Sequence, residues 1–444
     1  MLKTSDSEIY KLIKLEEKRQ KEGLELIPSE NYTSQAVMEA MGSALTNKYS
    51  EGYPKKRYYG GNEFIDDVEI LAQERAKKLF GVEHTNVQPY SGSPANLAVY
   101  LATCKPGDTI MGLNLPDGGH LTHGWKVSAT AIFYKSVPYH VMADGHIDTD
   151  EVLKLAKEHK PKLIWVGATA YPYKYDYKAF AEIADKVGAY MAADIAHVAG
   201  LIVAGVHPSP VPYAHIITTT THKTLRGPRG GMIMTTKKGL KKDPELADKI
   251  DKAVFPGLQG GPHDHQTAAI AVALKEAATP VFKKYGAQIV KNAKILADEL
   301  KKLGLSLVAN GTENHLLLLD LVPILGPGGG IFGQHALEAA GMTANKNTIP
   351  KDLSTPFYPS GIRLGTPAIT SRGMKEKEMK QIAKWIFAVV NEIRHYRLPT
   401  TSKEERLSYI ANFKKEIDKN NNIKKIRAEV KNLCQKFPVP GRKI

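Results

Sequence analysis

Between residues 109 and 193 the sequence alternates short apolar segments with amphipathic ones, and this alternation restricts the chain to few folds. We expect strands and helices at these positions: strands at 109–113, 132–137, 163–166 and 189–193, and helices at 150–159 and 177–187. Strands that alternate with helices build an α/β domain around a largely parallel sheet. In such a sheet, ligands bind beyond the carboxyl ends of the strands.

The length and composition describe a globular protein with more than one domain. At roughly 150 residues per domain, 444 residues predict two or three domains. The sequence changes character at Thr279-Pro280, where Lys-rich helical patterns begin. We therefore expect an N-terminal helical arm at 1–30, a large domain at 31–278 and a small C-terminal domain at 279–444. No apolar run approaches the ~18 residues needed to span a bilayer.

The charge and the cysteines predict a cytoplasmic protein with anionic small ligands. The net charge is +15, but much of it lies in mixed Lys/Glu stretches, and no nucleic-acid-binding motif accompanies it. The chain opens with a charged amphipathic pattern that differs from a secretion signal, and the segment 5–8 reads as a capping box. The two cysteines, Cys104 and Cys434, are too few for a disulfide framework or a zinc site, which predicts a reducing compartment.

One lysine stands between two short apolar segments. Ile216-Ile217 leads into four threonines, His222 and Lys223, and a second apolar segment, 232–234, follows two glycines. Such a loop presents an amine to a small molecule on a rigid scaffold, and desolvation makes a lysine amine nucleophilic toward carbonyls. We predict that Lys223 carries pyridoxal phosphate as a Schiff base. The alternative is a solvated loop lysine.

A carboxylate is expected at the end of the predicted strand 189–193. Asp194 stands there, and His197 follows three residues later. A cofactor pyridine nitrogen that stays protonated needs such an acid on a rigid strand end. A helix N-cap is the other use of this aspartate, and one residue can serve both purposes.

Two histidine pairs are candidate metal ligands. His120 and His123 lie three residues apart, and His263 and His265 lie two apart. A zinc site needs further ligands, and none stands near either pair in the sequence, so we expect no metal. A neutral imidazole stacked on a planar cofactor is the rival use for one of these rings.

The segment 87–96 predicts a phosphate site. A short strand ends, a glycine-containing turn follows, and Ser93 and Pro94 are expected as N-cap and first residue of a helix. A helix that begins after such a turn points backbone N–H groups and its positive dipole end at an anion. The segment lacks the Walker and dinucleotide-binding patterns.

Two further loops have the composition of binding loops. The segment 49–61 contains four tyrosines, one glutamate and three cations, and it ends in two glycines. Arg363 lies between glycines and apolar residues, which predicts a fixed, bidentate carboxylate clamp.

Together these stretches resemble the serine hydroxymethyltransferase family. The resemblance covers nearly the whole chain, in the expected order, and the run from four threonines to His222-Lys223-Thr224 is its most specific part. It implies the type I fold of pyridoxal-phosphate-dependent transferases: a large domain with a mostly parallel seven-stranded sheet, and a smaller α+β C-terminal domain. It also implies a cytoplasmic homodimer with shared active sites, or a tetramer built from it.

The resemblance assigns cofactor contacts to this chain. Lys223 would be the Schiff-base lysine, and Asp194 would pair with the pyridine nitrogen. His197 would hydrogen-bond the phenolic oxygen, His120 would stack on the ring, and Thr169 would also contact the cofactor. The phosphate would be held by two sets of residues: Ser91, Gly92, Ser93 and His222 of one subunit, and Tyr49, Gly260 and Gly261 of the other.

The resemblance also implies the substrates and the reaction. The hydroxymethyl group of L-serine would pass reversibly to tetrahydrofolate through a pyridoxal-phosphate external aldimine, giving glycine and 5,10-methylenetetrahydrofolate for one-carbon metabolism. Arg363 would bind the substrate carboxylate, with help from Ser29 and Tyr59, and Glu51 would be the acid/base. The catalytic set would be Lys223, Glu51, His222 and Tyr59. The folate contacts would be Leu115, Gly119, Leu121 and Asn347.

Two alternatives remain open at this point. A folate-independent aldolase acting on threonine-like amino acids could use the same scaffold, and it would release glycine from threonine equally fast with and without folate. A basic nucleic-acid-binding protein without catalysis would lack a visible cofactor absorbance band and would bind RNA with a steep salt dependence.

Overall fold

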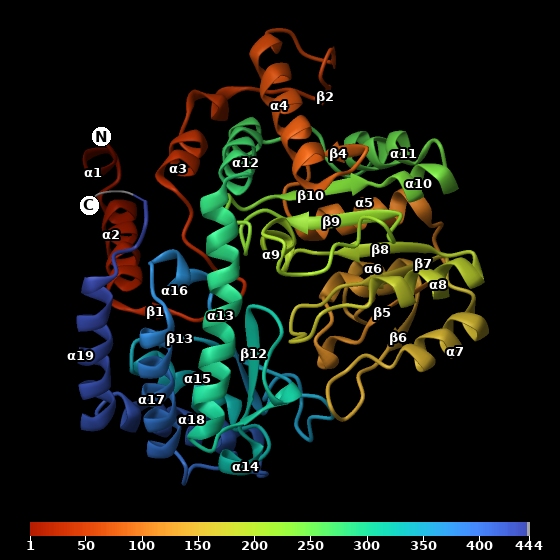
Figure 1. Ribbon diagram of the computed structural model, residues 1–444. Coiled ribbons are helices and arrows are strands. Elements are labelled where there is room, and N and C mark those ends of the chain that lie inside the picture. The colour runs from red at the N-terminus through yellow and green to blue at the C-terminus, as the bar shows by residue number, and fades with distance from the viewer. Residues whose placement is uncertain (442–444) are drawn as a thin grey trace. The chain divides into compact units, whose positions relative to one another are not determined.

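The computed structural model describes residues 1–441 and divides the chain into two compact units (Figure 1). Unit 1 comprises 1–32 and 291–440, and unit 2 comprises 33–290 with Gly441. The boundary differs from the expected one at 278/279 because Thr279-Pro280 does not separate two bodies. Pro280 instead begins the long helix α13 (Pro280–Lys302), a position that suits proline, and the division falls inside this helix.

Unit 2 is built around the seven-stranded sheet, and its mostly parallel architecture confirms the expected α/β fold (Figure 1). Five neighbouring strands run parallel, whereas β10 is antiparallel to both of its neighbours. The strand order across the sheet is β4 (His84–Asn86), β10 (Gly231–Thr235), β9 (Ile216–Thr220), β8 (Tyr190–Asp194), β7 (Leu163–Val166), β5 (Thr109–Leu113) and β6 (Lys135–Tyr139).

Both faces of this sheet are covered, which explains its continuous apolar strands. Successive residues of the central strands alternate between two cores; on β7, Trp165 faces one and Val166 the other. One core includes residues of the helices α5 (Gly92–Thr103) and α11 (Leu246–Lys252). The other includes residues of α4 (Glu63–Phe80), α7 (Thr149–His159), α8 (Tyr177–Val187) and α12 (Asp264–Ala277).

Several expected boundaries are confirmed, and others shift for local reasons. The strands β5 and β7 and the helix α8, which ends at Gly188 in a left-handed conformation, lie where the sequence predicts them. The segment 132–137 is not one strand, because the short helix α6 (Ala129–Phe133) precedes β6. Helix α5 starts after Ser91, two residues before the expected N-cap. Asp6 caps α2 (Ser7–Glu22), so the expected capping box is wrong.

Unit 1 combines a small antiparallel sheet with helices, as expected for the C-terminal domain. The sheet order is β11 (Ser306–Leu307), β12 (Leu316–Asp320), β15 (Gly361–Gly365) and β14 (Asn345–Asn347). Its core includes residues of the C-terminal part of α13 and of α15 (Gly330–Ala339), α17 (Glu376–Glu392), α18 (Lys403–Ile417) and α19 (Asn421–Lys436). No helix in the described residues 1–441 has the length and apolarity to cross a membrane.

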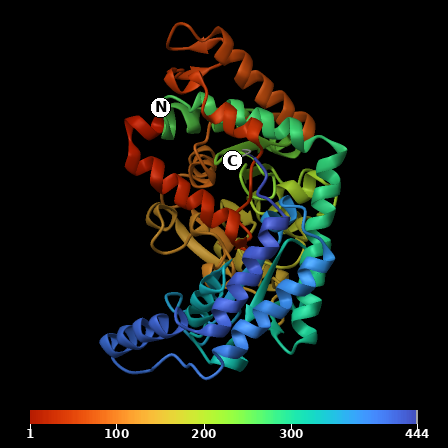
Figure 2. The ribbon, with the colours of Figure 1, turned by 90° about the vertical axis from the view of Figure 1, so that its left-hand side faces the viewer.

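The segments 1–32 and 291–440, far apart in the sequence, together form unit 1. Strand β1 (Leu24–Glu25) pairs in parallel with β13 (Met342–Thr343), and α2 packs on α19 (Figure 2). Buried Arg372 donates hydrogen bonds to the carbonyls that end α2, among them that of Gly23 at 2.7 Å. The N-terminal segment is therefore integrated into this unit.

The remaining elements are short: α1 (Leu2–Ser5), α3 (Gln35–Met41), η1 (Ala44–Asn47), β2 (Gly52–Tyr53), β3 (Lys56–Arg57), η2 (Leu115–Asp117), η3 (Leu121–His123), α9 (Ala199–Val203), α10 (Lys237–Lys242), η4 (Ala253–Leu258), η5 (Val308–Asn310), α14 (Val322–Leu325) and α16 (Pro367–Ser371).

Candidate active site

The lysine loop connects two fully buried strands, β9 and β10, as the sequence predicts. Its base is closed by hydrogen bonds from the Thr221 amide to Gly230 (3.1 Å) and from the Thr221 hydroxyl to Pro228 (2.7 Å). The Lys223 side chain is buried, with 9% of its surface exposed. A desolvated amine on a fixed loop has the properties of a nucleophile toward a carbonyl.

Thr224 joins the lysine loop to the end of strand β8. Its hydroxyl donates to the carbonyl of His197 at 2.9 Å and accepts from the amide of Gly200 at 3.0 Å. A Cβ on Gly200 would lie 2.2 Å from the Thr224 carbonyl oxygen, so this contact needs glycine. Strand pairing also places Asp194 opposite Thr218 of β9. Lys223, Asp194 and His197 therefore come from adjacent segments.

Asp194 is held ionised by its neighbours. Burial opposes its charge, but hydrogen bonds from His123 (3.1 Å) and Asn96 (2.9 Å) outweigh burial, and the pKa of Asp194 lies well below its ordinary value. Asn96 also contacts Thr122 at 2.8 Å and accepts from Thr218 at 2.7 Å. This carboxylate can keep a pyridine nitrogen protonated.

The sequence patterns single out neither Asn96 nor the contact between His123 and Asp194. Asn96 lies three residues after Ser93 on α5, so helical spacing could have placed it on the face that begins at the phosphate turn. The sequence spacing offers His123 only as a candidate metal ligand or as one of the rings that could stack on a cofactor. Its ring stacks on Trp165 with centroids 5.1 Å apart, which fixes its orientation toward Asp194.

His120 is suited to stacking because its ring is neutral. Burial lowers the pKa of His120 to about 4. The charge of Asp194 raises this pKa and that of Lys223 lowers it, but burial is the largest effect. Its Nδ1 lies 2.8 Å from the Thr122 hydroxyl. Among the described residues 1–441, one group of histidine, cysteine or acidic side chains has its ligand atoms close enough together to hold a metal ion: His120, His123 and Asp194. His123 and Asp194 hydrogen-bond each other directly at 3.1 Å, and this contact stabilises the carboxylate.

The start of α5 has the features of a phosphate site. Ser91 is its N-cap but makes no side-chain capping bond, so the first N–H groups of the helix remain available. A Cβ on Gly92 would lie 2.8 Å from a methyl group of Thr220, and one on Gly231 would lie 2.6 Å from the Ser91 carbonyl. The helix start therefore lies against both ends of the lysine loop.

His222 adds an observation that fits a bound phosphate. Its Nδ1 is buried, and no hydrogen-bond partner for it exists among the described residues. Burial, with the charges of Lys223 and Arg229, lowers the pKa of His222 to about 3, so the ring is a neutral donor or acceptor. A buried nitrogen without a partner is expected where a ligand supplies the missing contact.

Five predicted residues form a second cluster, which we call the tyrosine cluster: Tyr49, Glu51, Tyr59, Gly260 and Gly261. The Tyr49 hydroxyl donates to Glu51 Oε1 at 3.2 Å, and the rings of Tyr49 and Tyr59 have centroids 4.8 Å apart. A Cβ on Gly260 would lie 3.0 Å from the Glu51 carboxylate. Tyr90, next to Ser91 in the chain, donates to the Gly261 carbonyl at 2.7 Å.

Three predicted substrate and folate contacts lie in unit 1. Arg363 on β15 is buried, burial lowers its pKa to about 10, and its Nε donates to Asn345 Oδ1 at 3.1 Å. Asn347 lies on β14, the strand paired with β15. The segment that contains Ser29 runs beside the end of β15, where a Cβ on Gly365 would lie 2.6 Å from Pro28.

The other folate residues lie together in unit 2, in the segment that follows β5. Leu115 is half-buried, whereas Leu121 is 49% exposed. Gly119 has no room for a side chain, since a Cβ would lie 1.9 Å from the Leu113 carbonyl. The amide of Thr169 donates to Gly118 at 2.7 Å, which joins this segment to the loop after β7.

A buried lysine, an ionised aspartate at a strand end, a neutral histidine and a helix start, all at one edge of this sheet, define a pyridoxal-phosphate-dependent enzyme of the type I fold.

Comparison with known sequences identifies the family. The sequence profile described as serine hydroxymethyltransferase matches residues 2–386. A serine hydroxymethyltransferase of Acidothermus cellulolyticus is 54% identical over 444 residues, covering 99% of this chain and 97% of the relative. One of Sorangium cellulosum is 56% identical over 437 residues, covering 98% and 96%. The chain belongs to the serine hydroxymethyltransferase family. Enzymes of this family use pyridoxal phosphate to interconvert serine and glycine, with tetrahydrofolate as co-substrate.

Proposed function

We propose that this chain transfers the hydroxymethyl group of L-serine to tetrahydrofolate, with pyridoxal phosphate held at Lys223. Asp194 would hold the pyridine nitrogen, His120 would cover the ring, and His197 would bind the phenolic oxygen. The start of α5 and His222 would hold the phosphate. When bound, the cofactor supplies an electron sink at the α-carbon. The observation that carries this proposal is the ionised Asp194 beside the loop of the buried lysine.

The remaining roles concern substrate orientation and proton transfer. We propose that Arg363 holds the serine carboxylate, assisted by Ser29 and Tyr59. A guanidinium clamp fixes which bond at the α-carbon is cleaved, because orientation selects among reactions open to the same group. Glu51 would move a proton at the substrate hydroxyl. Folate would contact these residues: Leu115, Gly119, Leu121 and Asn347.

We further propose that the enzyme is a cytoplasmic homodimer or a tetramer of such dimers. The tyrosine cluster would act in the partner's site, as in the family that the sequence resembles. One observation supports the dimer: Tyr49 and Tyr59 belong to a predicted binding loop, yet about half of each is exposed and so available to a partner subunit. Another supports the cytoplasm: both cysteines are free thiols, as in a reducing compartment.

The experiment that tests the proposal replaces Lys223 by Ala. Serine cleavage with tetrahydrofolate and the visible absorbance of the bound cofactor should both be lost, whereas Lys241→Ala, an exposed lysine of the same unit, should retain both. Borohydride treatment and peptide mapping should label position 223 in the wild type. Full turnover in the Lys223 variant, or glycine release from threonine at equal rates with and without folate, would overturn the proposal.

A further inference from the structure

The carboxylate proposed as acid/base lies at the start of a short hairpin. Strands β2 and β3 pair antiparallel, with Gly52 opposite Arg57, and Glu51 directly precedes β2. The hairpin is only two residues long on each side, so ladder hydrogen bonds alone hold it weakly. Its conformation must therefore depend on side-chain contacts.

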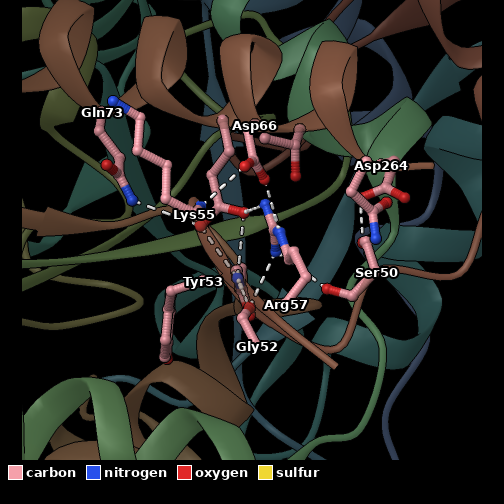
Figure 3. Close-up of polar contacts among 12 residues, drawn as sticks. Ser50, Gly52, Tyr53, Lys55, Arg57, Asp66, Gln73 and Asp264 are labelled. Carbon is pink, nitrogen blue, oxygen red and sulfur yellow. Dashed lines mark hydrogen bonds and ion pairs between the residues drawn. The ribbon is translucent and has the colours of Figure 1, made fainter. Parts of the chain in front are cut away.

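Arg57 supplies these contacts from inside the protein. Its side chain is only 4% exposed. Its Nη1 donates to the carbonyls of Ser50 (2.9 Å) and Gly52 (2.8 Å), the residues on either side of Glu51. Figure 3 shows the guanidinium beside Asp66 and near the backbone of Ser50 and Gly52. The backbone before and after Glu51 is thus fixed by one planar group.

Two carboxylates of α4 hold the guanidinium in turn. Arg57 Nε donates to Asp66 at 2.9 Å, and Nη2 donates to the buried Glu69 at 2.6 Å. One N–H of Nε, two of Nη1 and one of Nη2 are used, so four of its five donors are engaged. Gln88 completes the arrangement by donating to both Gly52 (3.0 Å) and Glu69 (2.9 Å).

The same contacts hold the backbone from which the Glu51 side chain extends. With the carbonyls of Ser50 and Gly52 bonded to Arg57, the Glu51 carboxylate lies at Tyr49 and Gly260 of the tyrosine cluster. The Ser50 hydroxyl donates to Asp264 of α12 at 2.7 Å, which anchors the preceding residue as well.

We propose that Arg57 is a positioning residue for Glu51: held by Asp66, Glu69 and Gln88, it fixes the peptide groups on both sides of the acid/base and so keeps its carboxylate in register with the substrate. This inference rests on the proposed role of Glu51. Only a planar guanidinium can bridge two carbonyls and two carboxylates at once, and an ammonium group at this place cannot.

The test uses Arg57→Lys, which retains the charge opposite Glu69 but loses the paired donors of Nη1. We expect kcat for serine cleavage with tetrahydrofolate to fall about 10- to 100-fold, the effect of a small misplacement of a reacting group. The KM for serine and the cofactor occupancy should stay within about twofold, because Arg57 contacts neither. Amide hydrogen exchange should accelerate in the peptide 49–61. Arg75→Lys, which alters an arginine–carbonyl bond between α4 and α12, is the matched control and should change none of these quantities.

A double-mutant cycle separates this inference from the proposed function. In a Glu51→Gln background, Arg57→Lys should change the residual turnover by less than about twofold, because it acts through a group already removed. An equal loss in both backgrounds, unchanged kcat in Arg57→Lys or unchanged exchange at 49–61 would overturn the inference. Full turnover in Glu51→Gln alone would overturn the role of Glu51 and the inference with it.

A second variant covers the case that Arg57→Lys does not fold. Gln88→Met removes one donor from the Gly52 carbonyl and one from the Glu69 carboxylate, and it leaves both ion pairs of Arg57 in place. It should lower kcat in the same direction by a smaller factor, with the same dependence on Glu51. Independence from Glu51 in this variant would contradict the inference.

Discussion

Asp194 depends on two residues that no catalytic motif identifies. Asn96 and His123 both donate to the same carboxylate oxygen, and they overcome the burial that would otherwise raise the pKa of Asp194. The sequence predicted the aspartate from its place at a strand end. Its partners could not be predicted in the same way, since they depend on which helix and which loop pack beside β8.

Asn96→Ala should weaken cofactor binding. A hydrogen bond to a charged group contributes about 1.5–3 kcal/mol, so we expect the dissociation constant of pyridoxal phosphate to rise about 10- to 100-fold. Titration of the apoenzyme with the cofactor, followed by fluorescence, measures this. Asn292→Ala removes a buried asparagine of unit 1 and should reduce stability without changing cofactor affinity. Equal affinities of Asn96→Ala and wild type would refute the prediction.

At the level of elements, the apolar strands and the amphipathic helices were predictable, because burial on both faces of a sheet leaves a continuous apolar signal. β7 and α8 are examples. The start of α5 and the composite segment 129–139 were not, since their boundaries depend on tertiary contacts that override local preference. The roles of the site residues stay predictions, although the structure brings Lys223, Asp194 and His120 to one place.

Strand β1 makes the stability of unit 1 depend on pH. Burial and the charge of Glu30 raise the pKa of Glu25 to about 8, whereas a glutamate in the unfolded chain titrates near ~4.3. Between these values the folded state retains a proton that the unfolded state releases, so stability falls as pH rises from about 4 to 8 and then levels off.

Glu25→Gln should remove this decline, because the amide keeps the neutral form at every pH. Melting temperatures should be measured by calorimetry at pH 5, 6, 7 and 8. The melting temperature of the wild type should fall relative to that of the variant as the pH rises, so that the variant gains several degrees over the wild type between pH 5 and pH 8. Glu8→Gln, an exposed glutamate of the same unit, should follow the wild type. Parallel curves for wild type and Glu25→Gln would show that the expectation is wrong.

At the level of the whole molecule, active sites are shared between subunits if the tyrosine cluster of one subunit acts in the site of the other. If Glu51 acts in the partner's site, mixing and reassembling the inactive Lys223→Ala protein with the Glu51→Gln protein, which keeps only residual turnover, should restore activity. Random pairing of two subunits gives half heterodimers, each with one intact site, so about a quarter of wild-type activity should return. Unmixed variants treated identically should stay at their own low activities, and a mixture that gains no activity over them would place Glu51 in its own subunit's site.

The pairing of β1 with β13 also affects how the chain matures during its synthesis. Residues 33–290 form nearly all of unit 2 and are contiguous, so this unit can fold while the ribosome is still adding the rest. Leu24 and its neighbours must wait for a partner strand more than 300 residues away, at Met342. Until that strand emerges, strand β1 remains without its partner, so unit 1 can be completed only late in synthesis.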